Sequence, residues 1–286
     1  MSGDRLAVLK TYKLYVGGAF PRTESGRYDQ AVDGQGRVIA NYCRASRKDF
    51  REATVAARGA QPGWAARSAY NRAQILYRVA EMLEGRADQF VAELEALGAP
   101  DPGLEVEAAV DRLVYYAGWC DKYPQVFSSV NPVASSHFNF SVLEPTGVVA
   151  ILAPAEPALL GLVSTLAPVL AGGNTCVALA PASNPLCAVT LAEVLATSDV
   201  PGGVVNLLTG RRDELGEHFA SHMDVNALWI CGGEDEAVAE LERQAVHNLK
   251  RVCRDDRGDW FAADAESPYE ILPFQEVKTT WHPIGS

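Results

Sequence analysis

The sequence lacks the cysteine patterns that mark disulfide frameworks and zinc sites. Its six cysteines are spread along 286 residues, and no two of them form a Cys-x-x-Cys pair. Disulfide-rich domains and structural zinc sites both depend on closely placed cysteines, so neither is indicated. Scattered thiols favour a reducing cytoplasm. The six are Cys43, Cys120, Cys176, Cys187, Cys231 and Cys253.

Positive charge is also scarce. The chain has 25 basic and 36 acidic residues, which gives a net charge of −11. Surfaces that bind nucleic acid carry an excess of lysine and arginine, so we expect no nucleic-acid partner. The start of the chain, MSGDRLAVLK, has neither the basic and apolar segments nor the cleavage site of a secretory signal. We therefore expect a cytoplasmic protein.

Charge is almost missing from residues 147–174. This run, GVVAILAPAEPALLGLVSTLAPVLAGGN, holds one charged residue, Glu156, and is long enough to cross a bilayer. Its three prolines would interrupt a spanning helix, and no positive cluster flanks it. The residues favour a buried strand at 148–152, a turn at 153–156 and an apolar helix that begins near Pro157. We expect no membrane span.

A repeating strand and helix pattern continues to residue 249. Strands are predicted at 148–152, 175–179, 204–208 and 228–231, with helices near 157–171, 184–196, 212–222 and 234–249. Short apolar strands separated by helices predict a parallel sheet that is covered on both faces, with right-handed crossovers. The fold class is therefore α/β, a doubly wound, Rossmann-like parallel sheet. Ligands of such sheets bind beyond the carboxyl ends of the strands.

The N-terminal third is predicted to add helices to this domain. It begins with a short strand at KLYVGGAF and continues through an extended segment at 36–42 to Ser46, a helix cap. Apolar residues at three-four spacing predict one long helix over 68–98, and another helix is expected at 104–122. Residues 1–123 and 147–255 would form one Rossmann-like domain.

Residues 124–146 have a different pattern. Polar and apolar residues alternate in FSSV and SSHFNFSVLEP, which is typical of an exposed two-stranded ribbon. Such a ribbon would carry Phe127, Phe138 and Phe140 next to unpaired strand edges, and unpaired edges attract further strands. We expect a protruding β-ribbon that serves as an oligomerisation element.

Several segments, taken in order, resemble a known family. They are KLYVGGAF, RVIANYCRASRKDFREATVAARGAQPGW, NRAQILYRVAEMLEGR, LEPTGVVAILAP, LAPVLAGGNTCVALAPAS, VPGGVVNLLTG and HMDVNALWICGG. The set covers about residues 13–252 and resembles the N-terminal half of the aldehyde dehydrogenase superfamily. The later EVKTTWHP resembles the family's C-terminal oligomerisation strand. The resemblance implies that 124–146 and 270–286 together build the ribbon.

The resemblance also shows where this chain departs from working enzymes. Their turn after the first strand reads close to PWN, and its Asn amide helps to hold the oxyanion. Here the turn reads Pro154, Ala155 and Glu156. An ionised carboxylate would repel an oxyanion, and losing one such donor costs about 3 kcal/mol of transition-state stabilisation. We expect the change to be disabling.

The cofactor motifs are altered as well. The family's KPAE, whose Lys and Glu reach the adenosine ribose, becomes the segment 180–183, Ala-Pro-Ala-Ser, and its FTGS becomes Ile-Cys-Gly-Gly at 230–233. Acids at 234–236 would stabilise the next helix through its dipole but oppose a pyrophosphate. Gly210, Gly232 and Gly233 are the remaining candidates for cofactor contact, or they are turn residues alone. We expect no cofactor or weakly bound NAD.

The resemblance further implies a catalytic domain that this sequence does not contain. In the family, the strand that matches LKRV leads to the general-base Glu and then to the domain with the nucleophilic Cys. Here it leads directly to the C-terminal strand, and 33 residues follow Cys253, whereas a domain needs about 100. Cys231 is a poor replacement because three acids follow it and no histidine lies nearby in sequence. Cys253 is no better, because arginines and aspartates balance each other around it. We predict no catalytic or metal site, and solvated histidines at 218 and 222.

These features predict a non-catalytic aldehyde dehydrogenase-like scaffold or subunit. It is similar to the truncated, non-catalytic C-terminal unit of family-sixteen aldehyde dehydrogenases, which takes the place of a dimer partner. The expected partner is a full-length aldehyde dehydrogenase or a second copy, bound through residues 127–143 and 276–284. Two alternatives stay open, an NAD(P)-dependent aldehyde oxidoreductase with a rearranged site and a nucleotide-binding module without chemistry.

Overall fold

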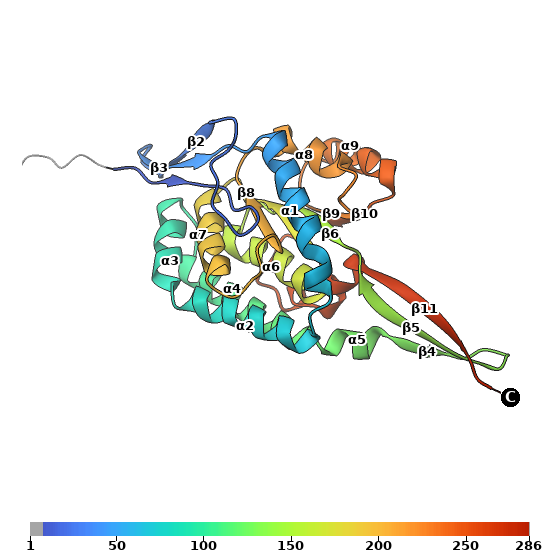
Figure 1. Ribbon diagram of the computed structural model, residues 1–286. Helices are drawn as coiled ribbons and strands as arrows, with labels where there is room; N and C mark the ends of the chain where they lie inside the picture. Colours follow the sequence, from blue (N-terminus) through green and yellow to red (C-terminus); the bar gives the residue numbers. More distant parts are fainter. Residues whose placement is uncertain (1–7, 286) are drawn as a thin grey trace, which may run out of the picture.

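A five-stranded parallel sheet forms the centre of the computed structural model, which describes residues 8–285 (Figure 1). The order across the sheet is β10-β9-β6-β7-β8. Numbered along the chain and read from β8, the order is 3-2-1-4-5, the Rossmann arrangement. The winding reverses between β6 and β9. The predicted α/β doubly wound fold is confirmed. The strands are β6 (Val148–Leu152), β7 (Thr175–Leu179), β8 (Val205–Leu208), β9 (Ala227–Cys231) and β10 (Arg251–Asp255).

Helices cover both faces of the sheet. One face packs against the large apolar cluster formed by α2 (Ala69–Glu84), α3 (Ala87–Ala96), α4 (Pro102–Trp119), α6 (Ala158–Ala171) and α7 (Pro185–Ala196). The other face packs against a second cluster, formed by α1 (Arg47–Ala65), α8 (Arg212–Ser221) and α9 (Asp235–Ala245), which the short turn η1 (Val246–Asn248) follows.

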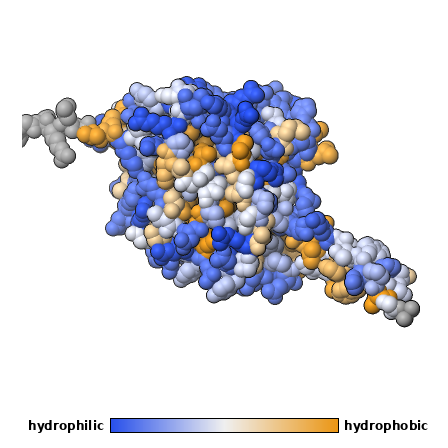
Figure 2. All heavy atoms as spheres, in the orientation of Figure 1, coloured by the Kyte–Doolittle hydropathy of each residue, from blue (hydrophilic) through white to orange (hydrophobic). Residues whose placement is uncertain are grey.

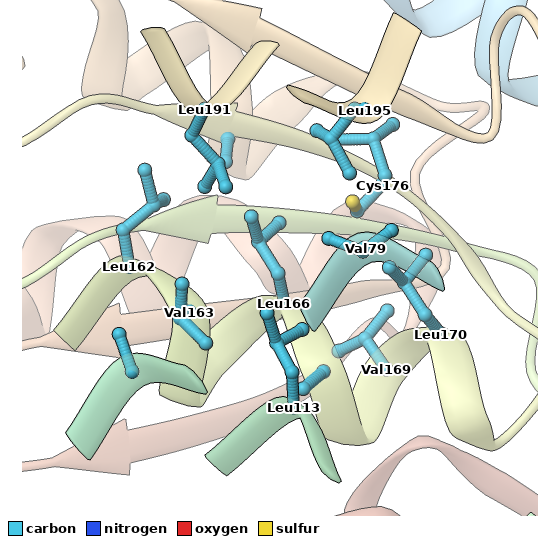
Figure 3. Close-up of a cluster of buried hydrophobic side chains, with 14 of the residues drawn as sticks. Val79, Leu113, Leu162, Val163, Leu166, Val169, Leu170, Cys176, Leu191 and Leu195 are labelled. Atoms are coloured by element: carbon cyan, nitrogen blue, oxygen red, sulfur yellow. The ribbon is translucent and has the colours of Figure 1, made fainter. Parts of the chain in front are cut away.

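Helix α6 explains the uncharged run of the sequence. All its residues are buried, and Figure 3 shows its Leu162 and Leu166 among side chains of α2, α4, α7 and β7. A helix that is apolar all round belongs in a core when neighbours enclose it. Within residues 8–285, no helix combines the length and the apolar character that crossing a membrane requires.

The single long helix predicted over 68–98 is wrong. The stretch forms α2 and α3, which are separated at Gly85 and Arg86. The N–H of Gly85 donates to the carbonyl of Glu81, and Arg86 leaves the helical region with φ −117° and ψ 16°. Both helices bury residues in the same cluster, so the apolar spacing continues through the break. The glycine was the only signal of an interruption.

The N-terminal strands form a small sheet of their own, in the order β1-β3-β2. Its members are β1 (Thr11–Tyr12), β2 (Tyr28–Val32) and β3 (Val38–Cys43). The strand predicted at KLYVGGAF is reduced to isolated bridges, in which Tyr15 pairs with Leu207 of β8 and Val16 with Ala19. Ser46 caps α1 as predicted and shares a capping box with Asp49.

The ribbon projects from the body as an arm (Figure 1). It follows α5 (Lys122–Phe127), so the predicted start at residue 124 is helical instead. The arm consists of β4 (Ser129–Asn131), β5 (His137–Pro145) and β11 (Gln275–Pro283) in the order β11-β5-β4. Nine residues of β11 pair antiparallel with β5. The ribbon is therefore three-stranded, because the last strand returns to it.

Residues 256–274, here called the connecting segment, join β10 to β11. They contain the 3₁₀ turns η2 (Ala263–Ala265) and η3 (Pro268–Phe274). Trp260, Ile271 and Phe274 from this segment are buried in the large cluster. The ring of Phe274 lies 5.0 Å from that of Trp229 in β9, measured between centroids. The connecting segment is thus part of the core.

Candidate functional site

The candidate site is the crevice at the carboxyl ends of β6 to β9. The turns after these strands comprise residues 153–157, 180–184, 209–211 and 232–234. Ligands of open α/β sheets bind in this crevice because the helices on either side of the reversal point run to opposite faces. Glu156, Cys231 and the three candidate glycines lie on these turns or at the ends of these strands, whereas Cys253 lies within β10.

The three candidate glycines are placed at the ends of β8 and β9. Gly232 has φ +57°, and a methyl group built on it would meet nothing within 4 Å. A methyl group on Gly210 would lie 3.2 Å from the side chain of Leu215. Gly233, with φ +117°, would place one 2.9 Å from Nη2 of Arg212. Gly232 and Gly233 meet the need for positive φ in a turn, and their contact with a cofactor stays a prediction.

Arg212, the first residue of α8, contacts the end of β9. Its Nη1 donates to the carbonyl of Cys231 and its Nη2 to that of Gly232, both at 2.7 Å. The half-buried position lowers the pKa of this guanidinium, mainly by desolvation. These contacts satisfy the carbonyl groups at the end of β9 and fill the space beside Gly233. Sequence reasoning missed this role, because an arginine in a helix start gives no signal of the turn it reaches.

A buried carboxylate occupies the N-terminus of α6. Oε1 of Glu105, from α4, accepts the N–H of Leu159 at 2.6 Å and that of Leu160 at 3.3 Å. Desolvation raises the pKa of Glu105, the two hydrogen bonds act against this, and nearby Glu156 raises it further. Helix N-termini attract anions, and this one is taken by the chain's own carboxylate. Sequence reasoning missed Glu105 as well.

Glu156 lies beside this N-terminus, in the wall of a pocket of about 270 Å³. The pocket has apolar walls that include Leu94, Leu104 and Phe261, and Glu105 and Ser183 also line it. Glu156 is exposed, and the hydroxyl of Ser183 donates to the carbonyl of Ala155. An ionised Glu156 presents negative charge where the resemblance expects a hydrogen-bond donor.

The adenosine side of the crevice is a hollow of about 550 Å³ at the ends of β7 and β8. Ala182, Gly210 and Arg211 line it together with Asp29. Nε of Arg211 lies 3.4 Å from Oδ2 of Asp29, so this cation in the wall of the hollow is already paired. Residues 180–183 supply neither the ammonium nor the carboxylate that the family uses on the ribose. The residues present do not fit a tightly held dinucleotide.

The cysteines at this edge are poor nucleophiles. Cys231 is 2% exposed, and burial, with Asp255 and Cys253 adding to it, raises the pKa of its thiol well above the usual value. Burial also raises the pKa of Cys253 to about 12, helped by Glu270 and Asp255 and opposed by Arg257. Thiolates, not thiols, attack carbonyl carbons. Neither side chain is prepared for catalysis.

Residues 8–285 contain no group of three or more His, Cys, Asp or Glu side chains arranged to hold a metal ion. His218 and His222 do lie together, but beside Arg47 and Arg51, which would repel a cation.

The connecting segment closes the edge of the sheet beside β10. Arg257 donates to Asp255 and, at 2.7 Å, to Glu270, and its guanidinium lies 4.7 Å from the ring centroid of Trp260. From α4, the buried Arg112 donates to the carbonyl of Trp260 at 3.0 Å. These contacts fasten the segment to the domain. The alternation of aromatic and charged residues here was a signal that sequence reasoning left unused.

The arm carries exposed apolar side chains on all three of its strands. Val277 is 64% and Trp281 58% exposed, and on the other strands Val130 is 67% and Phe138 45% exposed. In Figure 2 the arm, at the lower right, shows scattered orange atoms among pale and blue ones. Within residues 8–285 the outer edge of β11 pairs with no strand. Such an edge can accept a strand from another chain.

Comparison with known proteins extends these observations. Residues 21–256 match the model of the aldehyde dehydrogenase family. The chain is 30% identical to the "Putative aldehyde dehydrogenase DhaS" of Bacillus subtilis (strain 168), over 94% of this chain and 53% of that protein. It is also 30% identical to the human mitochondrial 10-formyltetrahydrofolate dehydrogenase, over 87% of this chain and 28% of that protein.

Solved structures give the same result. A variant of aldehyde dehydrogenase C from Pseudomonas syringae, in complex with NAD+ and octanal, superposes with a TM-score of 0.76 at 25% identity, covering 85% of this chain and 49% of that one. This chain therefore spans about half the length of the Bacillus and Pseudomonas proteins and under a third of the human one. Because the family model matches far more than half of the residues, the chain belongs to the aldehyde dehydrogenase family.

Proposed function

We propose that this chain is a non-catalytic aldehyde dehydrogenase-like subunit that assembles with a full-length aldehyde dehydrogenase or with a second copy of itself. One observation carries the proposal. The connecting segment takes the chain from the fifth strand of the sheet to the last strand of the arm within residues 256–274, and it is packed into the core as it does so. In the working enzymes that this chain resembles, the domain with the nucleophilic cysteine lies in the sequence between these two strands.

The crevice supports the same proposal. Glu105 occupies the N-terminus of α6, and Arg212 fills the space beside Gly233. Each contact occupies backbone groups at the edge of the sheet where ligands of such folds bind. Cys231 and Cys253 have thiol pKa values raised by burial. A dehydrogenase needs a thiolate, an oxyanion donor and a dinucleotide in one place, and the side chains here favour none of the three.

The arm supports the choice of partner. It presents exposed apolar side chains and a free outer strand edge over the nine residues of β11. Such a surface suits an antiparallel or side-by-side contact with the arm of a related chain. We propose the arrangement of the family-sixteen C-terminal unit, in which a non-catalytic unit takes the place of a dimer partner. Its cysteines suit a reducing cytoplasm.

Two measurements test this proposal. The purified chain, mixed with NAD+ and a panel of aldehydes, is expected to produce no NADH above a heat-treated control. Steady NADH production that disappears in Cys231→Ala would refute the non-catalytic assignment and support the oxidoreductase alternative.

The second measurement concerns the arm. A tagged chain is expected to recover a full-length aldehyde dehydrogenase from the native cell, or to sediment as an oligomer. Val277→Arg places a charge on the exposed arm and is expected to weaken this association at least tenfold without changing the melting temperature. Val55→Arg, on the exposed face of α1, is the matched control. A chain that stays monomeric and recovers no dehydrogenase contradicts the proposal.

A nucleotide-binding module is the second candidate, and the hollow at the ends of β7 and β8 is what favours it. Calorimetry with NAD+, NADP+ and adenine nucleotides tests this candidate. Micromolar affinity that is abolished by Gly232→Val would support it, and no measurable heat would remove it.

A further inference from the structure

A second concave site lies at the opposite end of α8 from Arg212. It is a hollow of about 360 Å³ between the first turns of α1 and the last turn of α8. Of its seven lining residues, two are arginines, two are histidines that become positively charged on protonation, and none is acidic. They are Arg47, Phe50, Arg51, His218, Ser221, His222 and Met223.

The two arginines are free to take a ligand. Arg47 and Arg51 stand one turn apart on α1 and are exposed. In the part of the chain that the structure describes, neither side chain forms a salt bridge or a hydrogen bond. The neighbouring Lys48 instead points to Glu24, with Nζ 3.6 Å from Oε2. The planar guanidinium group matches the geometry of a phosphate better than a lysine ammonium does.

The histidines complete the wall. Nδ1 of His222 accepts the N–H of Asp224 at 3.2 Å, so the neutral ring carries its proton on Nε2 and can donate from there. The edge of this ring packs against Phe50, with centroids 5.7 Å apart and planes at 83°. Phe50 in turn stacks on Phe219 of α8, with centroids 4.2 Å apart. The site is therefore held by the packing of two helices.

Burial and the neighbouring cations oppose protonation of the two histidines that line the hollow. Burial lowers the pKa of His218, Arg47 lowers it further, and Glu217 acts against both. Burial also lowers the pKa of His222. Asp224 opposes this shift, whereas Lys250, Arg51 and Arg47 add to it. Positive groups gathered in this way repel one another, and an anion placed among them removes the repulsion.

We propose that this hollow binds a small phosphomonoester. Arg47 and Arg51 supply the positive charge for the phosphate, and Nε2 of His222 donates to it. Met223, which is 66% exposed, contacts the carbon body of the ligand. The volume suits a small molecule. The site shares no residue with the crevice, so it does not depend on the proposed function.

Calorimetry at low salt, with phenyl phosphate and inorganic phosphate as probes, tests the site. Saturable binding is expected, tighter for phenyl phosphate because its ring meets the exposed side chain of Met223. Arg47→Ala and Arg51→Ala should each weaken binding at least tenfold. Lys48→Ala removes the same charge from the same helix turn and should leave affinity within twofold. Thermal unfolding verifies that each variant is folded.

Three outcomes would overturn the proposal. They are the lack of saturable binding for both probes, an equal loss in Lys48→Ala, and inorganic phosphate binding as tightly as phenyl phosphate. The last outcome would leave an anion site without the ester that we propose.

Sulfate isolates the histidines, because it keeps its double charge at mildly acid pH. A bound anion raises the pKa of both imidazoles, so binding takes up protons and tightens as the pH falls. Affinity for sulfate should rise several-fold from about pH 8 to about pH 5.5. The double variant His218→Gln/His222→Gln should lose this dependence. A dependence that persists in the double variant contradicts the assigned role of the histidines.

Discussion

The carboxyl edge of the sheet and the arm treat their polar groups in opposite ways. At the edge, Arg212 binds the carbonyl groups of Cys231 and Gly232, and Glu105 binds the N–H groups of α6. On the arm, the outer edge of β11 finds no strand within residues 8–285, and Trp281 stays 58% exposed. This chain therefore satisfies its own polar groups at the carboxyl edge of the sheet. It leaves the outer strand edge of the arm unpaired within residues 8–285, and the arm is the part that we propose is used for assembly.

The largest expected effect tests whether the connecting segment truly closes the core. Phe274→Ala removes a fully buried ring that packs on Trp229, and deletions of this kind cost about 3–5 kcal/mol of unfolding free energy. Urea unfolding followed by fluorescence measures the change. Tyr269→Ala, in the same segment but 66% exposed, should change stability by less than about 0.5 kcal/mol. Similar losses for both variants would mean that the segment is not part of the core.

The thiols at the carboxyl edge provide the next test. With a pKa of about 12, against an ordinary value of 9.0, Cys253 should have about a thousandfold less thiolate near neutral pH than a free thiol. Alkylation by iodoacetamide, followed by mass spectrometry, should be slow in the folded chain and should rise with pH up to that value. Unfolding in urea should restore ordinary reactivity. Rapid alkylation of Cys253 or Cys231 in the folded state would show an active thiol at the edge.

Arg212→Ala tests the contact between the start of α8 and the end of β9. It leaves two carbonyl groups without their charged donor, and we expect a loss of about 2 kcal/mol in unfolding free energy. Arg211→Ala is the matched control, because Arg211 is 52% exposed and reaches Asp29 only at 3.4 Å. The control should lose less than about 0.5 kcal/mol. If the two variants are equally stable, the hydrogen bonds of Arg212 do not stabilise the crevice.

The smallest effect is expected on the arm. Lys278 and Glu144 form an ion pair across β11 and β5, with exposed fractions of 65% and 45%. Such pairs contribute about 0.5 kcal/mol or less, so Lys278→Ala should leave the melting temperature almost unchanged. A large loss of stability would show that the isolated arm depends on its own side chains rather than on a partner.

The pattern of the sequence was sufficient for four of the five strands of the sheet, but not for β10 or for the closure of the crevice. Runs such as Val148–Leu152 and Thr175–Leu179 are apolar along their whole length and are bounded by turns, so their strands were predicted to the residue. The break at Gly85 was missed because apolar spacing passes through it unchanged. Periodicity reports which face is buried and not where the backbone bends.

The site residues show the same division. Gly210, Gly232 and Gly233 were placed at strand ends by local pattern alone, and the structure puts them there. Glu105 lies 54 residues before its partner Leu159, and Arg212 lies 19 before Cys231. Contacts between such distant positions depend on how α4 and α8 pack on the sheet. No local pattern in the sequence contains that information.

The return of β11 to the arm has a consequence for biosynthesis. β5 and β11 pair at positions at least 130 apart, beginning with Pro145 and Gln275. A pairing this distant forms late because a long loop must close first. Until residues 275–283 leave the ribosome, β5 has only the three residues of β4 beside it. The arm is therefore completed after the rest of the domain has been translated, and the capture of another subunit that we propose would follow synthesis rather than accompany it.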